Sequence, residues 1–360
     1  MFLSHIYLQN FRNYKKSEFT FSKDTTLIVG PNASGKTNLL EAVYLLASGK
    51  SFRAEKDTQL IRFNEDIARV KGSAEQNSEQ ASETTQLEVM LTTGLVNGQK
   101  TQMKKYMVNG VPKRRIDFIS HLPAVLFAPV DLDMIVSSPH LRREFLNDVL
   151  ELVDKEYRFS LNEYVKALRQ RNALLETAKD TGRRQEREFE YWDNVLIKNG
   201  NIVTKKREEL IQAINDSKKN IFDFIMFYDK SVISRERLDQ YEEGELGSGV
   251  TLVGPHRDDF SVHMYNMSRS TTHDVKLFGS RGQQRLVVLQ LKVLQLLFTK
   301  KRLNHRPALL LDDIFSELDE GHIHLVLEML GKQQTIITTT HQEFVTKKEL
   351  HGMDVIELEK

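Results

Sequence analysis

The chain has 360 residues, of which 40% are hydrophobic and 28% charged, enough for a sizeable core and for two units of structure. The absence of cysteine excludes disulfides and cysteine-ligated metal sites and fits a reducing cytoplasm, where we expect the protein to act. The net charge of +1 excludes a uniformly basic chain, so a polyanionic partner would have to be held by a local patch.

Three strand-like runs open the chain, at residues 3–9, 18–21 and 26–29. They do not resemble a signal peptide, because residues 1–6 alternate in polarity and lack a basic segment followed by an apolar one.

The third run leads into a glycine-containing loop, and leucines, valine and alanine then recur at helical spacing from Leu39 to Ala47. Strand, loop and helix in this order predict a phosphate-binding loop, because backbone N–H groups and the helix dipole converge on one anion. We expect ATP to be bound by Gly30, Pro31, Asn32, Ala33, Ser34, Gly35, Lys36 and Thr37. Lys36 should reach the β- and γ-phosphates and support catalysis, and Thr37 should bind Mg²⁺.

The next segment predicts an antiparallel region with candidate strands at 67–71 and 87–92. Residues 72–86 are polar, so we expect a mobile loop tip there. Asn97-Gly98 and Asn109-Gly110 predict hairpin turns. The candidate DNA-binding residues of this region are Lys104, Lys105, Lys113, Arg114 and Arg115. A solvated strand face accounts for these charges equally well.

Residues 142 to about 227 are helical in pattern, and apolar residues fall seven apart at Phe189, Leu196, Val203 and Leu210. This pattern favours a short helical hairpin packed on itself over a long coiled-coil arm, which would need many more heptads.

Two features flank this hairpin. Pro139 should begin a helix, because the first helical turn needs no N–H donor at that position. Residues 242–249 are acidic and glycine-rich and predict a linker. In the stretch that follows, we interpret His256 as structural, and we expect Arg257 and Asp258 to form an ion pair.

The C-terminal part supplies the partners of the phosphate loop. An apolar run at 308–311 predicts a buried parallel strand that delivers Asp312 and Asp313 at its end. Asp312 should hold Mg²⁺ through its water shell, and Asp313 should orient or polarise an attacking water. A β-branched strand at 335–340 then ends at His341.

Ser280-Arg281-Gly282-Gln283-Gln284-Arg285, placed before a helical run, resembles the signature motif of ABC-type ATPases. The resemblance implies that Ser280, Gly282 and Gln283 contact the γ-phosphate of ATP held by a second subunit. Residues 316–319 are similar to the D-loop of that family, and His341 stands where its transporters carry a switch histidine.

A closer resemblance, to the RecF family of recombination mediator ATPases, is carried by Phe11-Arg12-Asn13-Tyr14, Gly30-Pro31-Asn32 and Gly49-Lys50-Ser51-Phe52-Arg53, and by residues 123–129, 138–147 and 254–260. The chain departs from that pattern at Val130 and Asn147, where the family usually has acids. In related SMC proteins a basic residue at the place of Arg12 lies near the nucleotide phosphates, so Arg12 is a candidate nucleotide ligand.

The resemblance implies an α/β fold: an ABC/SMC-type P-loop ATPase lobe from residues 1–120 and 245–360, with a mainly helical lobe, 121–244, inserted. It further implies an ATP-dependent homodimer of recombinational repair, replication restart and the SOS response to DNA damage. Such a protein binds double-stranded DNA near single-strand gaps and junctions and helps to load RecA with RecO and RecR. The ATP-bound dimer acts as a clamp on DNA, and its slow, DNA-stimulated ATP hydrolysis resets that clamp.

Two other function classes share the nucleotide motifs. One is the ATPase subunit of an ABC-type transporter, which would need separate membrane subunits because no run here approaches the ~20 apolar residues of a bilayer span. The other is an ATP-sensing scaffold in which the nucleotide only stabilises a protein complex.

Overall fold

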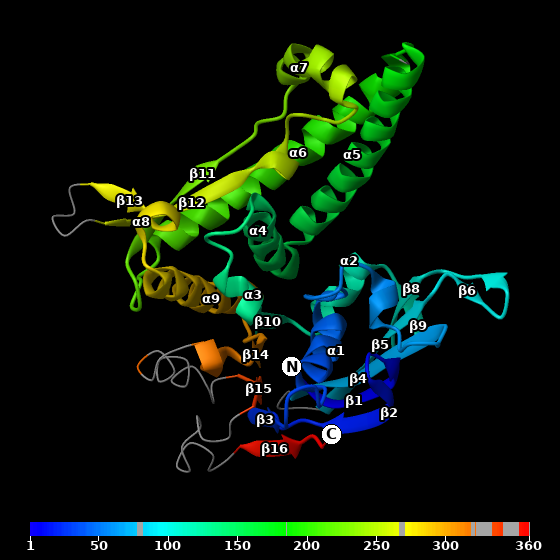
Figure 1. The fold of residues 1–360 in the computed structure, drawn as a ribbon, viewed down its shortest axis with the longest axis vertical. Helices are drawn as coiled ribbons and strands as arrows, with labels where there is room; N and C mark the ends of the chain where they lie inside the picture. Colours follow the sequence, from blue (N-terminus) through cyan, green and yellow to red (C-terminus); the bar gives the residue numbers. More distant parts are fainter. Residues whose placement is uncertain are drawn as a thin grey trace. The chain divides into compact units, whose positions relative to one another are not determined.

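The computed structural model describes residues 1–77, 82–184, 186–265, 271–317, 321, 333–340 and 353–359. The chain divides into two compact units, Met1–Val130 with Leu296–Lys360, and Asp131–Gln295 (Figure 1). The inserted unit therefore spans residues 131–295 and not the expected 121–244, because residues 121–130 belong to the first unit and residues 245–295 to the second. One reason is that strand β12 (Asp259–Tyr265) pairs over its length with β11 (Phe224–Asp229) of the same unit.

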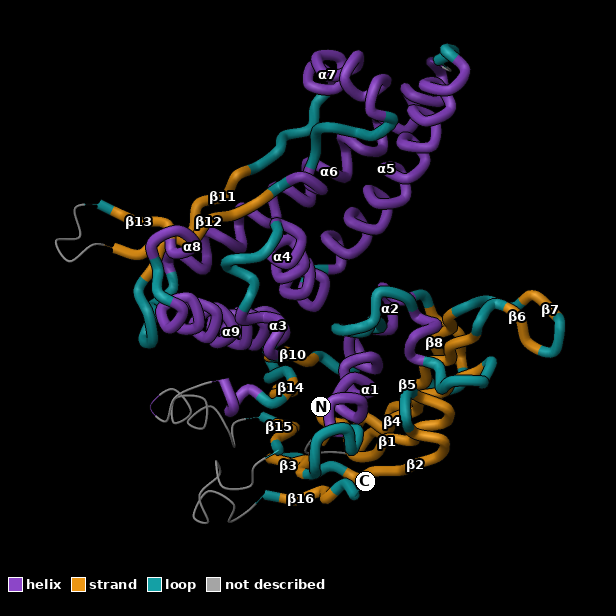
Figure 2. Tube along the Cα trace, viewed as in Figure 1, coloured by secondary structure: helices purple, strands orange, loops and turns teal. Residues whose placement is uncertain are grey.

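The first unit contains a parallel sheet whose strands come from both ends of the chain (Figure 2). Its strands, in spatial order, are β10 (Ala124–Phe127), β14 (Ala308–Asp312), β15 (Thr335–Thr339), β3 (Thr25–Val29) and β16 (Asp354–Glu357). Every residue of β3, β14 and β15 is buried, as expected for parallel strands covered on both faces.

An antiparallel sheet lies in the same unit. Its strands, in spatial order, are β2 (Tyr14–Thr20), β1 (Phe2–Phe11), β4 (Ile67–Asn77), β5 (Ser82–Thr92), β8 (Lys104–Val108) and β9 (Val111–Lys113). The short strands β6 (Leu95–Val96) and β7 (Gln99–Lys100) form a separate ribbon. The Asn-Gly turns are confirmed, because Asn97 and Asn109 both have φ 50° and the glycines after them also have positive φ.

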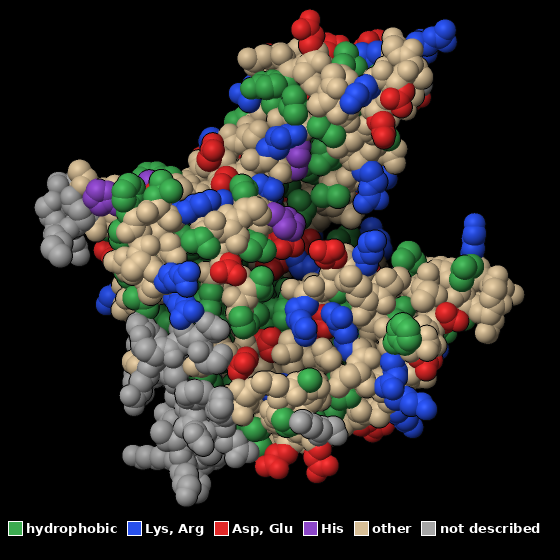
Figure 3. All heavy atoms as spheres, in the orientation of Figure 1, with side chains coloured by type: hydrophobic (Ala, Val, Ile, Leu, Met, Phe, Trp, Pro, Cys, Tyr) green, Lys and Arg blue, Asp and Glu red, His purple; other side chains and the backbone are tan. Residues whose placement is uncertain are grey.

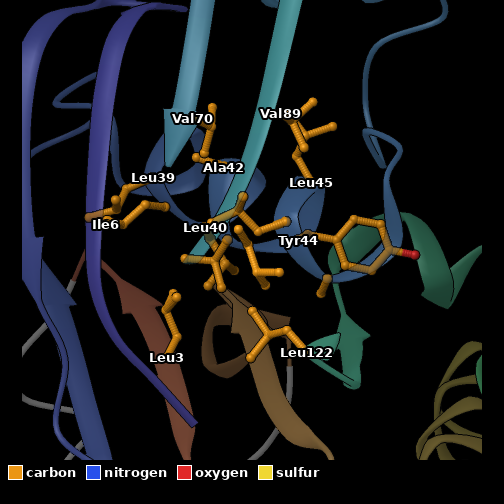
Figure 4. Packing of buried hydrophobic residues seen from close by; sticks show 14 of the residues in the cluster. Leu3, Ile6, Leu39, Leu40, Ala42, Tyr44, Leu45, Val70, Val89 and Leu122 are labelled. Carbon is orange, nitrogen blue, oxygen red and sulfur yellow. The ribbon is translucent and has the colours of Figure 1, made fainter. Parts of the chain in front are cut away.

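Helix α1 (Lys36–Ser48) packs in a core shared by both sheets. Figure 4 shows Leu39 of this helix beside Ile6, Ala42 beside Val70, and Leu45 beside Val89. The same cluster includes residues of the parallel sheet, so α1 is buried on nearly all sides. This explains its almost uninterrupted apolar sequence.

The expected loop tip at 72–86 is wrong for residues 72–77 and 82–86, which belong to β4 and β5, and residues 78–81 lie outside the described residues. Strands β4 and β5 pair in register from Ile67 opposite Thr92 to Asn77 opposite Ser82. Gly72 and Ala74 point inward and are buried, and strand β1 pairs with β4 as far as Glu75. Glycine and alanine at the inward positions differ little in hydrophobicity from the polar residues between them, so the sequence does not show the alternation of a strand here.

The second unit is mainly helical (Figure 2). Its long helices are α4 (Pro139–Val153), α5 (Lys155–Thr181) and α6 (Glu186–Asp216). Helices α5 and α6 form the expected hairpin, and the apolar residues spaced by seven on α6 are all buried. Pro139 is the first residue of α4, as predicted.

The remaining elements complete the two units. They are the helices α2 (Arg115–Phe118), α3 (Pro129–Leu132), α7 (Arg235–Ser248), α8 (Val275–Phe278) and α9 (Arg281–Leu303), the strand β13 (Thr272–Asp274), and the 3₁₀ turns Asp57–Leu60, Ile119–His121, Pro255–Arg257 and Ile314–Glu317.

Two expectations for the middle of the chain are wrong. The helical pattern does not run to residue 227, because β11 begins at Phe224. The acidic stretch 242–249 is not a linker but largely the end of α7. Glu245 is fully buried there, because its carboxylate pairs with Arg171 at 2.7 Å and accepts the backbone N–H of Leu252 at 2.7 Å.

Asp258 lies at the centre of a buried polar network and is not the partner of Arg257. It accepts hydrogen bonds from Arg207 Nη1 at 2.9 Å, from Ser231 N at 2.7 Å and from the hydroxyl of Tyr228. Arg257 instead donates to the carbonyl of Thr251 at 3.0 and 3.1 Å. The expected ion pair is therefore wrong, because the backbone directs the two neighbouring side chains to different partners.

Two further positions, Asn147 and His256, make contacts that the sequence alone does not predict. Asn147, one of the departures from the RecF pattern, accepts hydrogen bonds from Arg207 at 2.9 Å and from Tyr157 at 2.6 Å. His256 shares a hydrogen bond of 2.7 Å with Tyr164 and contacts the carbonyl of Thr251, and burial lowers its pKa to about 4. These contacts agree with the structural interpretation of His256.

We predict that Asp258→Ala lowers the free energy of unfolding by about 3 to 5 kcal/mol, because it leaves the Arg207 guanidinium buried without its carboxylate partner. Urea unfolding followed by circular dichroism measures the change. The control, Asp239→Ala, removes an exposed acid of the same unit and should have an effect below ~0.5 kcal/mol. Equal stability of the two variants would contradict the prediction.

Candidate nucleotide-binding site

The loop after β3 has the backbone conformation of an anion-binding turn. Ala33 and Gly35 have left-handed φ values of 67° and 105°, which turn successive N–H groups toward one side. A Cβ at Gly30 would lie 2.5 Å from the carbonyl oxygen of Leu358, and one at Gly35 would lie 2.7 Å from Asn13 Nδ2. Both positions therefore require glycine.

Ser34 and Lys36, two of the expected phosphate ligands, lie at the end of this loop and at the start of α1. The hydroxyl of Ser34 is buried and makes no hydrogen bond within the described residues, directly before the first turn of α1. A buried orphan hydroxyl beside a helix N-terminus fits a phosphate oxygen. Lys36 Nζ donates to the carbonyls of Gly30 at 2.7 Å and Pro31 at 2.9 Å. Burial lowers the pKa of Lys36, and the charges of Asp313 and Asp312 partly oppose this shift.

The turn between β1 and β2, together with the first residue of β2, donates hydrogen bonds to the loop after β3. Tyr14 OH donates to the carbonyl of Gly35 at 3.1 Å, and Asn13 Nδ2 to that of Ser34 at 3.4 Å. Asn38 of α1 donates to Asn13 Oδ1 at 2.8 Å. In the sequence, residues 11–14 stand out only through the family resemblance. The structure shows that two of them position the loop.

Arg12, the candidate phosphate ligand of this turn, is bound to α1 in this structure. Its Nε and Nη2 atoms donate to the two oxygens of Glu41, both at 2.8 Å, and Nη1 donates to the carbonyl of Gln59 at 2.9 Å. Glu41 is fully buried and also accepts from Ser51 Oγ at 2.5 Å. The structure thus gives Arg12 an anchoring contact, and its contact with nucleotide stays a prediction.

The two expected magnesium ligands lie together, since Thr37 Oγ1 donates to Asp312 Oδ1 at 2.9 Å. Burial raises the pKa of Asp312, whereas hydrogen bonds from Thr338 and Thr37 and the charge of Arg53 lower it. A hydroxyl beside a carboxylate offers the hard oxygen ligands that Mg²⁺ prefers, so these residues fit that ion.

Asp313 follows with a left-handed φ of 46°, and its N–H bonds to Thr338. Sequence reasoning did not select Thr338 or Arg53 as site residues. The resemblance of residues 49–53 was a signal for Arg53, whereas nothing local distinguishes Thr338 from the other threonines of its strand.

The signature-like residues begin helix α9 and belong to the second unit, not to the C-terminal part of the ATPase lobe as expected. Ser280 Oγ accepts from the N–H of Gln283 at 3.3 Å, and Gln283 Oε1 accepts from the N–H of Ser280 at 2.8 Å. This reciprocal pair is a capping box. Ser280 and Gly282 are exposed, which leaves the start of the helix open to solvent.

The five candidate DNA-binding residues do not form one free basic patch. Lys104 pairs with Asp57 at 2.6 Å, Arg114 with Asp117 at 3.0 Å, and Arg115 donates to the carbonyl of Ser48 at 3.0 Å. Lys104 and Lys105 are adjacent on a strand and so point to opposite faces. On the face shown in Figure 3, basic and acidic side chains are interspersed. The assignment to DNA stays a prediction.

Two expected features lie outside the described residues: His341 and the second half of the D-loop-like segment. Within the described ranges, no group of three or more His, Asp or Glu side chains is arranged to hold a metal ion. No helix in the part of the chain that the structure describes is both long and apolar enough to cross a membrane.

Comparison with known proteins decides the family. The model of the RecF/RecN/SMC N-terminal domain matches residues 2–357. A Bacillus cereus (strain AH820) protein named "DNA replication and repair protein RecF" is 33% identical over 380 residues, covering 98% of this chain and 96% of the relative. A Bacillus anthracis (strain CDC 684 / NRRL 3495) protein of the same name matches equally well.

The chain belongs to the RecF family.

Solved structures agree with membership of the RecF family. Two structures of "the recombination mediator protein RecF" in the RecFOR pathway, titled as complexes with ATPrS and with ATP, are 30% identical to this chain and cover 96% of it, with TM-scores of 0.82 and 0.83. An Smc head domain with an extended coiled coil from Pyrococcus furiosus, 18% identical with a TM-score of 0.51, shows likeness of fold alone. The expected ABC/SMC-type α/β fold is confirmed.

We predict that Lys36→Met weakens ATP binding at least ~30-fold, because a hydrogen bond from a charged donor contributes about 2 to 3 kcal/mol. Titration with a fluorescent ATP analogue measures the affinity. The control, Lys23→Met, removes an exposed lysine two residues before β3 and should bind like the unmodified protein. Unchanged affinity in Lys36→Met would place the nucleotide elsewhere.

Proposed function

We propose that this RecF-family chain is an ATP-dependent DNA-binding protein of recombinational repair and replication restart, with a weak, DNA-stimulated ATPase activity. The observation that carries the proposal is the hydrogen bond between Thr37 and Asp312, which brings the phosphate loop and a carboxylate together as one magnesium-nucleotide site. The orphan hydroxyl of Ser34 supports phosphate as the occupant of the loop.

The chemistry at this site is ATP hydrolysis to ADP and phosphate. Lys36 binds the β- and γ-phosphates, and Thr37 and Asp312 hold Mg²⁺. When bound, Mg²⁺ would neutralise part of the negative charge on the phosphate oxygens. Asp313 orients or polarises the attacking water. Its nearness to Lys36, whose pKa responds to the Asp313 charge, supports this role.

ATP is sandwiched between two copies of the chain. The exposed start of α9 supports this arrangement, because helix N-termini attract anions and Ser280 and Gly282 are open to solvent. These residues and Gln283 contact the γ-phosphate of ATP bound to the partner. Because ATP then binds only the closed dimer fully, its binding free energy stabilises dimerisation, and hydrolysis removes that contribution.

The macromolecular partners are double-stranded DNA near gaps and junctions, and the proteins RecO and RecR, with which the chain helps to load RecA in the cytoplasm. The names of the relatives, which speak of DNA replication and repair, and the titles of the solved structures, which speak of the RecFOR pathway, support these partners. Hydrolysis resets the ATP-bound clamp and releases it.

Fluorescence anisotropy of labelled double-stranded DNA, with and without Mg-ATP at one fixed salt concentration, tests the DNA function. We expect tight binding only with Mg-ATP.

Ser280→Arg should bind ATP yet lose this ATP-dependent DNA binding, because the added side chain obstructs closure of the dimer. ATP-independent binding would indicate a preformed surface. The absence of binding in both conditions would favour an ATP-sensing scaffold.

We predict that Asp313→Asn binds ATP with unchanged affinity and hydrolyses it roughly 100-fold more slowly, because the amide cannot accept a proton from water. Phosphate release in single-turnover experiments measures the rate. Asp24→Asn alters an exposed acid before β3 and should hydrolyse ATP at the normal rate. A normal rate in Asp313→Asn would move the catalytic role to another residue.

A further inference from the structure

Thr338 is a fully buried residue of β15, in the middle of the parallel sheet. The register between β14 and β15 places it directly opposite Asp312. Neighbouring strands of a sheet point their paired side chains to the same face, so this register brings the Thr338 hydroxyl to the Asp312 carboxylate.

The hydroxyl of Thr338 contacts both acids of the site. Its oxygen donates to Asp312 Oδ1 at 2.8 Å and accepts the backbone N–H of Asp313 at 3.0 Å. The carbonyl of Leu311 is a second acceptor within reach, but at 3.5 Å it competes poorly for the single hydroxyl proton. The proton therefore goes to the carboxylate, where the hydrogen bond is charge-assisted.

We propose that Thr338 is a positioning residue of the nucleotide site, which fixes the magnesium-binding carboxylate of Asp312 and the backbone of Asp313 through one hydroxyl group. This inference rests on the proposed function, since it concerns the same ATP and Mg²⁺.

The orientation of Asp312 follows from two hydroxyl groups acting together. Thr37 and Thr338 both donate to Oδ1, at 2.9 and 2.8 Å. Within the described residues, both side-chain hydrogen bonds of Asp312 thus lie on one oxygen, which fixes the rotation of the carboxylate and directs Oδ2 elsewhere. A β-branched threonine suits this role because its χ1 angle is restricted, so its hydroxyl is held in place before the ion binds. Removing such a supporting hydrogen bond typically weakens metal binding or activity by about 10- to 100-fold.

The backbone of Asp313 is held by the same residue. Its φ of 46° is left-handed, a conformation that aspartate tolerates better than most side chains do. The Asp313 N–H bonds to both the carbonyl and the hydroxyl of Thr338, at 3.1 and 3.0 Å. These two bonds fix the turn at the end of β14, and the turn sets the direction of the Asp313 side chain.

The test compares Thr338→Val, which is nearly isosteric but lacks the hydroxyl, with Thr338→Ala and Thr338→Ser. Thr335→Val is the matched control, because Thr335 is a buried threonine on the same strand whose hydroxyl contacts the carbonyl of Gln333. The melting temperature of each variant is measured with ATP in EDTA and then with increasing Mg²⁺, and each is compared with its own nucleotide-free value. ATP turnover is measured in parallel.

In Thr338→Val and Thr338→Ala, we expect the Mg²⁺ concentration for half-maximal stabilisation to rise by about 10- to 100-fold. The turnover rate should fall, while stabilisation by ATP in EDTA persists. Thr338→Ser should restore both properties, and Thr335→Val should match the unmodified protein.

An unchanged Mg²⁺ midpoint in both hydroxyl-free variants would overturn the role of Thr338, as would an equal shift in Thr335→Val, which would indicate a general packing effect. If the unmodified protein itself gains no stability from Mg-ATP, the proposed function fails, a result distinct from the failure of Thr338 alone.

Discussion

The hydrogen bond between Thr37 and Asp312 joins positions 275 residues apart, and the proposed nucleotide site depends on it. It exists because the parallel sheet brings both ends of the chain together, with β14, β15 and β3 side by side. In a parallel sheet all strands end at the same edge, so the phosphate loop after β3 and the acids after β14 meet there. The inserted unit, residues 131–295, lies between these segments in sequence. The chain leaves the first unit and returns to it once, so the insertion does not separate the strands of the sheet.

The same constraint explains the sequence of α1. A helix that follows directly on the loop after β3 and packs in a core shared by two sheets has little surface left for solvent. Its one buried acid, Glu41, is acceptable because Arg12 and Ser51 satisfy the carboxylate. The ion pair fastens the turn at residues 11–14 to the helix, and that turn supports Gly35 and Ser34. The packing of α1 and the conformation of the loop after β3 thus depend on one set of contacts.

The second unit is held by ion pairs between distant segments, all of them buried except at Asp259, which is half-buried. Arg207 of α6 pairs with Asp258, Arg171 of α5 pairs with Asp193 and Glu245, and Arg142 of α4 pairs with Asp259 at 2.6 Å. Breaking a buried pair leaves an uncompensated charge, so these contacts strongly disfavour other arrangements of the helices. Segment 254–260, whose resemblance to the RecF family indicated no role for it, supplies two of these acids, Asp258 and Asp259.

The sequence alone determined the features that depend on neighbouring residues: the phosphate loop and its helix, the Asn-Gly turns, the start of α4 at Pro139 and the heptad spacing of α6. Turn chemistry and helical period act over a few residues, so they are readable locally. Only the tertiary structure decided which arginine pairs with Asp258, why Lys104 is engaged by Asp57, and which threonine of β15 meets Asp312. These outcomes depend on strand register and on partners far away in sequence, which no local pattern specifies.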